Sequence, residues 1–245
     1  MQLDPWPYPL WIAHRGAGKL APENTLAAFR LGAQHGYRAF ECDVKLSRDG
    51  VPFLLHDDTL ERTTNGHGDA AERNWAELST LDAGGWHSRA FAGEPPASFG
   101  AIAAFCLRNR HRLNIEIKPS PGRERETGEA VARAAARLWA DEPVPPLLSS
   151  FKPQALEGAL AAAPALPRAL LVDSLWDGWF ERAQALRCVA VVANYRLFDR
   201  AMVVRLHGAR LRALAYTVND LDAAQALLAL GLDGLITDAV DRFAP

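Results

Sequence analysis

The sequence predicts an α/β protein with a (β/α)8 TIM-barrel fold. Nine short apolar runs alternate with longer amphipathic segments along most of the 245 residues, which is typical of parallel strands connected by helices. Two neighbouring runs are interpreted as one strand with a hairpin-like extension, which leaves the eight strands of such a barrel. The rival fold, an open doubly wound sheet, usually carries a glycine-rich turn followed directly by a helix. The stretch HRGAGK at 14–19 does not fit that pattern.

The individual elements follow from these runs in chain order. The runs predicted as strands are Leu10–His14, Ala39–Leu46, Val51–His56 (the extension), Leu113–Lys118, Leu147–Phe151, Ala169–Val172, Val189–Ala193, Leu211–Val218 and Gly234–Thr237. The segments predicted as helices are Asn24–His35, Phe99–Arg110, Glu124–Ala140, Pro153–Ala162, Trp176–Leu186, Asp199–His207 and Leu221–Leu230. Asn24 is predicted as the N-cap of the first helix, and Trp176 and Trp179, at helical spacing, are predicted to serve packing rather than ligand binding.

The segment from Asp57 to Ala97 breaks this alternation. It contains TTNGHGD, AGGW, AGEPP and one short helical pattern at Trp75–Leu81, and it is too long for an ordinary barrel loop. We therefore expect a single domain over residues 1–245, with a small insertion after strand two at about 57–97. The insertion is expected to cover the active-site end, with its helix capping the pocket.

Composition limits the kinds of function. The 27 Lys and Arg residues nearly balance the 29 Asp and Glu residues, which argues against nucleic-acid binding by bulk electrostatics. The 3 cysteines form no CxxC pair. No apolar stretch is long enough to span a membrane, so no stable membrane insertion is expected. Prolines at 5, 7 and 9 interrupt the N-terminal segment, which makes a poor signal peptide, and we expect a cytoplasmic protein.

Three carboxylates fall where the predicted strands end, which is the catalytic end of a TIM barrel. The period of two in a strand places Glu41 and Asp43 on one face, and Glu116 lies near the end of the next barrel strand. Burying three carboxylates together without a cation is costly, because like charges repel at short range. The pattern therefore predicts a site for one divalent cation, Mg²⁺ or Ca²⁺, since both prefer oxygen ligands.

Basic side chains lie beside this predicted cation site. Arg15 and Lys118 add positive charge that favours a phosphate group, and His14 and His56 can exchange protons near neutral pH. Each residue also has an ordinary structural interpretation, because an isolated histidine is more often a hydrogen-bonded structural residue. Their occurrence together at the ends of successive strands favours phosphoryl chemistry.

Six motifs occur in a fixed order along the chain: AHRG at 13–16, PENT at 22–25, FECDVKLSRDGVPFLLHD at 40–57, NIEIK at 114–118, AYTVN at 215–219 and GLDGLITD at 231–238. In this order they resemble the glycerophosphodiester phosphodiesterase family, from about Trp11 to Asp238. The resemblance implies hydrolysis of glycerophosphodiesters, such as glycerophosphocholine and glycerophosphoethanolamine, to sn-glycerol 3-phosphate and an alcohol. It also implies a barrel with a small insertion after strand two and a requirement for Mg²⁺ or Ca²⁺.

The resemblance also implies a role for each residue of the site. It assigns Glu41, Asp43 and Glu116 as metal ligands, His14 and His56 as the acid–base pair, and Arg15 and Lys118 as phosphate contacts. Tyr216 stands where the family commonly has Trp, so an aromatic face remains to pack on the glycerol carbons and a phenol is added. We assign His14 as the base and His56 as the acid, with the glycerol hydroxyl of the substrate as the nucleophile.

Two alternatives remain open. The phosphatidylinositol-specific phospholipases and the sphingomyelinase-D-like lipases have a similar barrel and histidine pair, and Trp75, Trp86 and Phe91 of the insertion are aromatic residues suited to a membrane. A barrel that binds phosphodiesters without turnover predicts the loss of a metal ligand or a histidine, and all of them are present. The partner expected is a small-molecule glycerophosphodiester, and the sequence assigns no oligomeric state.

Overall fold

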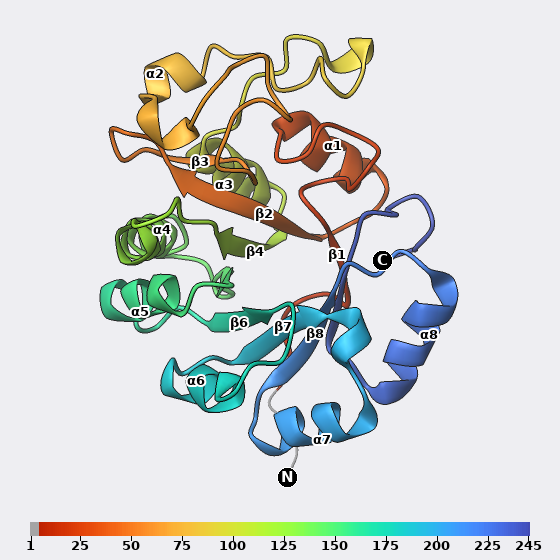
Figure 1. The fold of residues 1–245 in the computed structure, drawn as a ribbon. Helices are drawn as coiled ribbons and strands as arrows, with labels where there is room; N and C mark the ends of the chain where they lie inside the picture. Colours follow the sequence, from red (N-terminus) through yellow and green to blue (C-terminus); the bar gives the residue numbers. More distant parts are fainter. Residues whose placement is uncertain (1–4) are drawn as a thin grey trace.

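The computed structural model describes residues 5–245, which form a closed barrel of eight parallel strands (Figure 1). These strands are β1 (Trp11–Ala13), β2 (Ala39–Leu46), β4 (Arg112–Ile117), β5 (Leu147–Ser150), β6 (Arg168–Val172), β7 (Ala190–Asn194), β8 (Arg212–Tyr216) and β9 (Gly234–Thr237). Successive strands pair with each other, and β1 pairs with both β2 and β9, which closes the barrel. The (β/α)8 prediction is confirmed. Residues 1–4 of the predicted domain lie outside the described residues.

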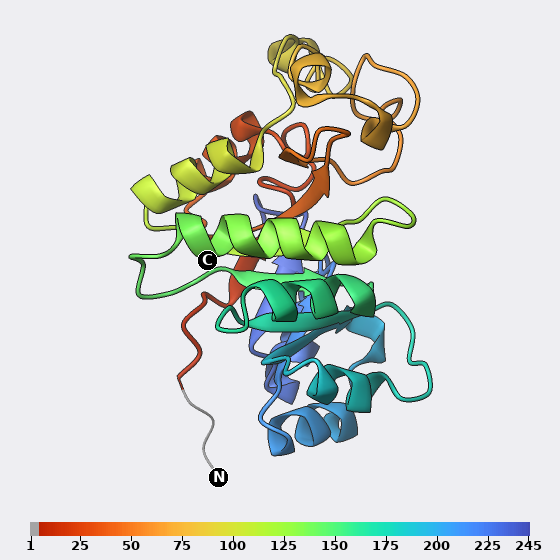
Figure 2. The ribbon, with the colours of Figure 1, turned by 90° about the vertical axis from the view of Figure 1, so that its left-hand side faces the viewer.

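Helices surround the barrel between successive strands (Figures 1 and 2). They are α1 (Leu26–Gln34), α3 (Phe99–Arg108), α4 (Glu124–Leu138), α5 (Pro153–Ala162), α6 (Trp179–Ala185), α7 (Arg200–Gly208) and α8 (Leu221–Leu230). The largest difference from the predicted bounds is at α6, where Gly178 adopts a left-handed φ of 87° and becomes the N-cap. Trp176 therefore precedes the helix and is 41% exposed, so it does not share the packed face of Trp179, which is buried.

The hairpin-like extension is strand β3 (Pro52–Leu54). It runs antiparallel to β2, with Leu54 opposite Val44, as the sequence predicted. The chain then reaches His56 two residues beyond the end of β3. Because the register runs back from Leu46, and the Leu55 N–H donates to the Asp43 carbonyl, the hairpin returns this histidine to the level of the carboxylates of β2.

Residues 57–97 form a separate layer outside the barrel, beside α1 and α3 (Figures 1 and 2). They contain helix α2 (Trp75–Leu78) and two short 3-10 helices, Ala70–Glu72 and Arg89–Phe91. The prediction that the helix caps the pocket is wrong, because the pocket lining described below contains no residue from this segment. The apolar side of α2 is used elsewhere, since Trp75 packs on Phe53 with ring centroids 5.9 Å apart.

The barrel interior changes from apolar to polar along the strands. Its apolar part consists of the buried side chains of Ile12, Ala39, Leu147, Ala169, Leu171, Ala190, Val192, Leu214 and Ile236. Along β2, Glu41 and Asp43 follow Ala39 on the inward face, whereas Phe40 and Cys42 belong to the cluster packed under the helices. The alternation of a single strand thus places carboxylates directly above an apolar floor.

Helices α4 and α5 cross with their backbones in contact. A Cβ atom added at Gly128 would overlap the carbonyl oxygen of Ala155. We predict that Gly128→Ala forces the helices apart and lowers the free energy of unfolding in urea by about 1–3 kcal/mol. The matched control is Gly208→Ala in α7, where, apart from its chain neighbours and the backbone of its own helix, no atom of residues 5–245 lies within 4 Å of the added Cβ. This control should leave stability unchanged or raise it by about 0.5 kcal/mol. Equal losses in the two variants would contradict the interpretation.

Candidate active site

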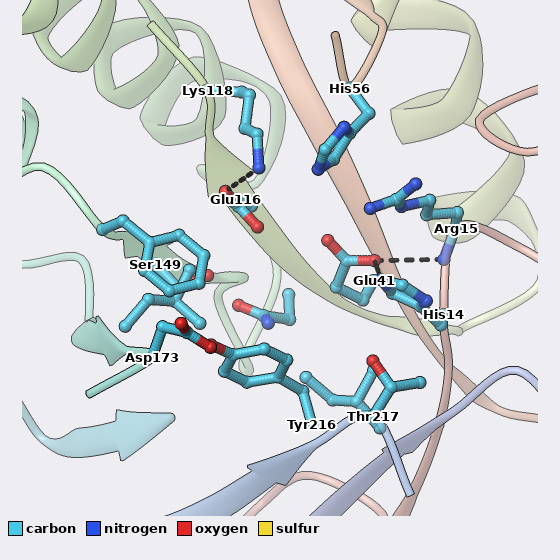
Figure 3. A pocket seen from close by; sticks show the side chains of 14 residues that line it. His14, Arg15, Glu41, His56, Glu116, Lys118, Ser149, Asp173, Tyr216 and Thr217 are labelled. Carbon is cyan, nitrogen blue, oxygen red and sulfur yellow. Dashed lines mark hydrogen bonds and ion pairs between the residues drawn. The ribbon is translucent and has the colours of Figure 1, made fainter. Parts of the chain in front are cut away.

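A pocket of about 220 Å³ opens where the barrel strands end (Figure 3). Its lining residues are His14, Arg15, Glu41, His56, Asn114, Glu116, Lys118, Ser149, Phe151, Leu171, Asp173, Tyr216, Thr217 and Ile236. The structure therefore brings together seven of the eight residues predicted for the site. The eighth, Asp43, is only 1% exposed and lies beside Arg15 and Lys118 at the same end of the barrel.

Three buried carboxylates converge beside this pocket. Glu41, Asp43 and Glu116 each have one oxygen within 4.8 Å of the oxygens of the other two. The register between β2 and β4 places Asp43 opposite Glu116, and the alternation along β2 puts Glu41 on the same face. Because all three are buried, little water screens their mutual repulsion.

Burial changes the protonation of these carboxylates. Loss of hydration, together with the charge of Asp43, raises the pKa of Glu41 to about 8 and the pKa of Glu116 to about 7. Burial also opposes ionisation of Asp43, but Arg15 and Lys118 outweigh it and lower the pKa of Asp43 to about 2. Glu41 Oε1 and Asp43 Oδ1 are buried without a hydrogen-bond partner among the described residues. Such unpartnered oxygens at short separation fit a divalent cation.

Two permanent cations flank the carboxylates. Arg15 places Nε 3.1 Å from Asp43 Oδ2 and Nη1 2.8 Å from Glu23 Oε1. Lys118 Nζ lies 2.8 Å from Glu116 Oε1 and 3.8 Å from Asp43 Oδ1. When all three converging carboxylates are ionised, they exceed these two cations by one negative charge. A divalent cation would reverse this balance to one net positive charge, which suits an anionic phosphodiester.

A carboxylate holds each of the two histidines. His14 Nδ1 lies 2.6 Å from Asp238 Oδ1, and His56 Nδ1 lies 2.7 Å from Asp57 Oδ1. A carboxylate at Nδ1 favours the tautomer with a proton on that nitrogen, which leaves Nε2 available to the pocket. In Figure 3 both rings lie on the same side of the pocket as Arg15. The arrangement fits proton transfer through the two Nε2 atoms.

The two imidazoles differ in electrostatic environment. Burial lowers the pKa of His14, but the hydrogen bond to Asp238 and the charge of Glu41 outweigh it, so the net shift is upward. Burial, aided by Arg15 and Lys118, lowers the pKa of His56. Two histidines whose pKa values are shifted in opposite directions have the electrostatic difference that an acid–base pair requires.

Sequence reasoning missed the two carboxylates that hold the histidines. Asp57 directly follows His56, and Asp238 directly follows β9. The criterion that identified His14, a polar residue at a strand end, applied to both of them. The sequence alone could not show that His14 contacts Asp238, because the two residues are 224 positions apart in the chain.

Asn24 has a role different from the predicted one. The N-cap of α1 is Thr25, whose side chain accepts a hydrogen bond from the Ala28 N–H. Asn24 lies in the left-handed region, with φ of 61°, and turns its amide toward β2. Its Nδ2 donates to Asp43 Oδ2 at 2.8 Å, and the Asp43 N–H donates to Asn24 Oδ1 at 3.1 Å. Asn24 therefore fixes the orientation of the most deeply buried carboxylate.

The opposite wall of the pocket contains Tyr216 (Figure 3). Its Oη donates to Asp173 Oδ1 at 3.2 Å, and its ring meets the ring of Phe151 edge-on at 5.7 Å. The sequence singled out Tyr216 but neither Asp173 nor Phe151. In Figure 3 this wall lies across the pocket from Arg15, so the pocket has a cationic side and an aromatic side.

The aromatic residues that favoured a membrane substrate are largely used for packing. Trp75 packs on Phe53, and Phe91 lies edge-on to His87 with centroids 5.5 Å apart. Trp86 is 42% exposed, whereas Trp75 and Phe91 are partly buried. No helix within residues 5–245 has the length and apolar character needed to cross a membrane.

Known proteins resemble this chain in sequence and in fold. The profile of the Glycerophosphoryl diester phosphodiesterase family matches residues 14–242. The chain is 32% identical over 236 residues to a glycerophosphodiester phosphodiesterase of Caldanaerobacter subterraneus subsp. tengcongensis, covering 94% of this chain and 93% of that protein. A phosphodiesterase of Oleispira antarctica, solved in complex with the product sn-glycerol-3-phosphate, is 36% identical with a TM-score of 0.88, covering 94% and 93% of the two chains. A glycerophosphodiester phosphodiesterase of Agrobacterium tumefaciens is 27% identical with a TM-score of 0.80, covering 96% and 98%.

The chain therefore belongs to the Glycerophosphoryl diester phosphodiesterase family, as the six motifs indicated. It is an enzyme of the phosphoric diester hydrolase class, and the alternative of a barrel without turnover is set aside. The matched segment contains every residue that the sequence predicted for the site.

Asn24 provides a test of how the site is held together. We predict that Asn24→Ala lowers the free energy of unfolding by about 2–4 kcal/mol, because it removes two hydrogen bonds to Asp43 and places alanine at a positive φ. Asn109→Ala, which removes one exposed hydrogen bond to the Phe105 carbonyl, is the matched control and should change stability by less than about 1 kcal/mol. Urea unfolding of both variants measures the difference. A loss at Asn24 no larger than at Asn109 would contradict the assigned role.

Proposed function

We propose that this enzyme hydrolyses glycerophosphodiesters, such as glycerophosphocholine and glycerophosphoethanolamine, to sn-glycerol 3-phosphate and an alcohol. The observation that carries the proposal is the group of three buried carboxylates beside Arg15 and Lys118, next to two histidines that are each held by a carboxylate. The Oleispira antarctica phosphodiesterase supports the choice of product, because sn-glycerol-3-phosphate is bound in its structure.

The proposed cofactor is one divalent cation, Mg²⁺ or Ca²⁺, held by Glu41, Asp43 and Glu116. When bound, it supplies positive charge to a non-bridging oxygen of the phosphate. Arg15 and Lys118 bind the same phosphate and stabilise the negative charge that grows on it in the transition state. The ring of Tyr216 packs against the glycerol carbons.

The proposed reaction proceeds in two steps. In the first step His14 takes the proton of the glycerol 2-hydroxyl, the oxygen bonds to phosphorus, and the bond to the alcohol breaks as His56 protonates the departing alkoxide. In the second step His56 takes a proton from water, the water oxygen attacks the cyclic phosphate, and His14 protonates the released 2-oxygen. The product is glycerol 3-phosphate, and both histidines return to their starting protonation states.

We further propose that residues 1–245 work as one domain with 57–97 as its insertion. We place the enzyme in the cytoplasm, acting on a small-molecule diester rather than on nucleic acid. The near-balance of 27 basic and 29 acidic residues supports the choice of a small-molecule substrate over nucleic acid, because the total charge does not favour a polyanionic partner. The lipase alternative has less support, since two of its three candidate aromatic residues are partly buried.

Substrate class and cofactor are tested together by a coupled assay for glycerol 3-phosphate. We predict release of glycerol 3-phosphate from glycerophosphocholine and glycerophosphoethanolamine, loss of activity in EDTA, and recovery on addition of Mg²⁺ or Ca²⁺. Full activity in EDTA would argue against the cation. Absence of glycerol 3-phosphate from every diester, with either cation present, would refute the proposed reaction.

The histidine pair is tested by substitution. We predict that His14→Ala and His56→Ala each lower kcat by about 10²–10⁴-fold, because each variant lacks one proton-transfer group. His35→Ala, at the exposed end of α1, is the control and should keep normal turnover. Near-normal activity in either site variant would remove that histidine from the mechanism.

The direction of proton transfer is tested with a better leaving group. The raised pKa of His14 and the lowered pKa of His56 favour the reverse assignment, with His56 as the base and His14 as the acid. The experiment must therefore distinguish the two assignments. A p-nitrophenyl ester of glycerol phosphate needs no acid to release its alcohol. We predict that this substrate restores turnover in His56→Ala but not in His14→Ala, and the opposite pattern would exchange the two roles.

Equal cleavage of glycerophosphocholine and bis(p-nitrophenyl) phosphate would exclude the glycerol hydroxyl as nucleophile.

A further inference from the structure

We propose that Arg62, in the insertion, is a positioning residue for two groups of the pocket, His56 and Arg15. Arg62 is not among the residues that line the pocket. It acts through two carboxylates, Asp57 beside His56 and Glu23 beside Arg15. This inference rests on the proposed hydrolysis at the pocket, and it gives the segment 57–97 a part in that reaction.

The guanidinium of Arg62 binds two carboxylates with two of its edges. Nε donates to Asp57 Oδ2 at 2.6 Å, and Nη2 donates to Asp57 Oδ1 at 2.9 Å. Nη1 donates to Glu23 Oε2 and Nη2 donates to Glu23 Oε1, both at 2.8 Å. Paired hydrogen bonds from a planar guanidinium fix the distance and the plane of a carboxylate. Arg62 therefore fixes Asp57 and Glu23 relative to each other.

The same carboxylate oxygens contact the pocket residues. Asp57 Oδ1, which accepts from Arg62 Nη2, lies 2.7 Å from His56 Nδ1. Glu23 Oε1 accepts from Arg62 Nη2 and also from Arg15 Nη1 at 2.8 Å. Figure 3 shows His56 and Arg15 on the same side of the pocket. One nitrogen of Arg62 thus contacts both the oxygen that orients the histidine and the oxygen that holds the arginine.

The backbone on either side of Arg62 is anchored. Leu60 is buried in a cluster with Phe53 and with Leu78 of α2. The Leu60 carbonyl accepts hydrogen bonds from the Thr64 N–H at 3.1 Å and from Thr64 Oγ1 at 2.7 Å, which closes a turn around Arg62. Packing of α2 therefore supports the turn that carries Arg62, although α2 does not line the pocket.

Charge also favours this arrangement. The hydrogen bonds from Arg62 hold the pKa of Asp57 well below its usual range. Burial opposes ionisation of Glu23, but Arg62 and Arg15 outweigh it and lower the pKa of that carboxyl. Both carboxylates are therefore ionised, and an ionised carboxylate has enough lone pairs to accept from Arg62 and from a pocket residue at once.

The first measurement is the proton NMR spectrum in water without substrate. A proton in a short hydrogen bond between imidazole and carboxylate gives a low-field signal, so His14 and His56 should each give one. In Arg62→Met the carboxylate of Asp57 is free to turn, so the His56 signal should be lost by exchange with water. The His14 signal, which depends on Asp238, should remain and show that the variant is folded. His56→Ala assigns the two signals.

The second measurement is a double-mutant cycle on kcat/KM for glycerophosphocholine with the activating cation. Arg62→Met should lower kcat/KM by about 10- to 100-fold, the range typical of residues that orient a site residue. In the His56→Ala background the loss should be at least about fivefold smaller, because only the link to Arg15 remains to be broken. A merely structural role predicts the same factor in both backgrounds.

Arg73→Met is the matched control. Arg73 is exposed in the same insertion and pairs with Glu77 at 3.7 Å. An exposed pair of this kind contributes little, so this variant should keep both low-field signals and a kcat/KM within about twofold of wild type. Arg62→Lys is the second variant. Its ammonium keeps the charge but cannot make paired bonds to two carboxylates, so it should recover only part of the loss in Arg62→Met.

Several outcomes would overturn the inference. They are retention of both low-field signals in Arg62→Met, an equal loss in the two backgrounds, and full activity in Arg62→Lys. Loss of both signals in Arg62→Met would also overturn it, because Arg62 would then support the whole fold. If the wild-type enzyme released no glycerol 3-phosphate, the proposed hydrolysis would fail, and the NMR spectra would still decide whether Arg62 orients His56.

Discussion

The site depends on keeping three carboxylates together in the interior of a barrel. Glu41, Asp43 and Glu116 repel one another where little water screens them, and a buried charge is stable only with compensating charge and hydrogen bonds. Arg15 and Lys118 supply two positive charges, and the amide of Asn24 fixes Asp43. With all three carboxylates ionised, one negative charge remains uncompensated. A bound divalent cation would change the net charge of the group to one positive charge. The acidic group, the basic group and the proposed preference for a phosphodiester thus follow from one electrostatic requirement.

The barrel supplies the geometry for this requirement. Parallel strands bring their carboxyl ends to one rim, so residues distant in the sequence meet there. The period of two along β2 supplies two carboxylates, and the paired strand β4 supplies the third from the register position opposite Asp43. The apolar cluster inside the barrel closes the site from below. The histidines lie just beyond β1 and β3, and each is oriented by an aspartate: His14 by the distant Asp238 and His56 by the adjacent Asp57.

What the sequence could predict was local. Apolar alternation located the strands and most helix bounds, and the charged residues at strand ends indicated the carboxylates, cations and histidines before any fold was known. Pairings between distant residues could not be predicted. Asn24 reaches Asp43 across 19 positions, and Thr25 caps α1 in its place. Trp176 fitted a helical pattern, but Gly178 starts α6 later and leaves that ring exposed. Helix α2 was expected at the pocket, yet its apolar side fits the cluster around Phe53.

The central claim is that the three carboxylates form a cation site, and direct binding tests it without reference to turnover. Isothermal titration calorimetry of the EDTA-treated and dialysed protein with Mg²⁺ or Ca²⁺ measures the stoichiometry and the affinity. The account predicts saturable binding of one cation per chain in the wild-type protein. It also predicts a large loss of affinity in Glu116→Gln, which keeps the size of the side chain but removes one charged ligand. No saturable binding of either cation, or unchanged affinity in Glu116→Gln, would contradict the claim.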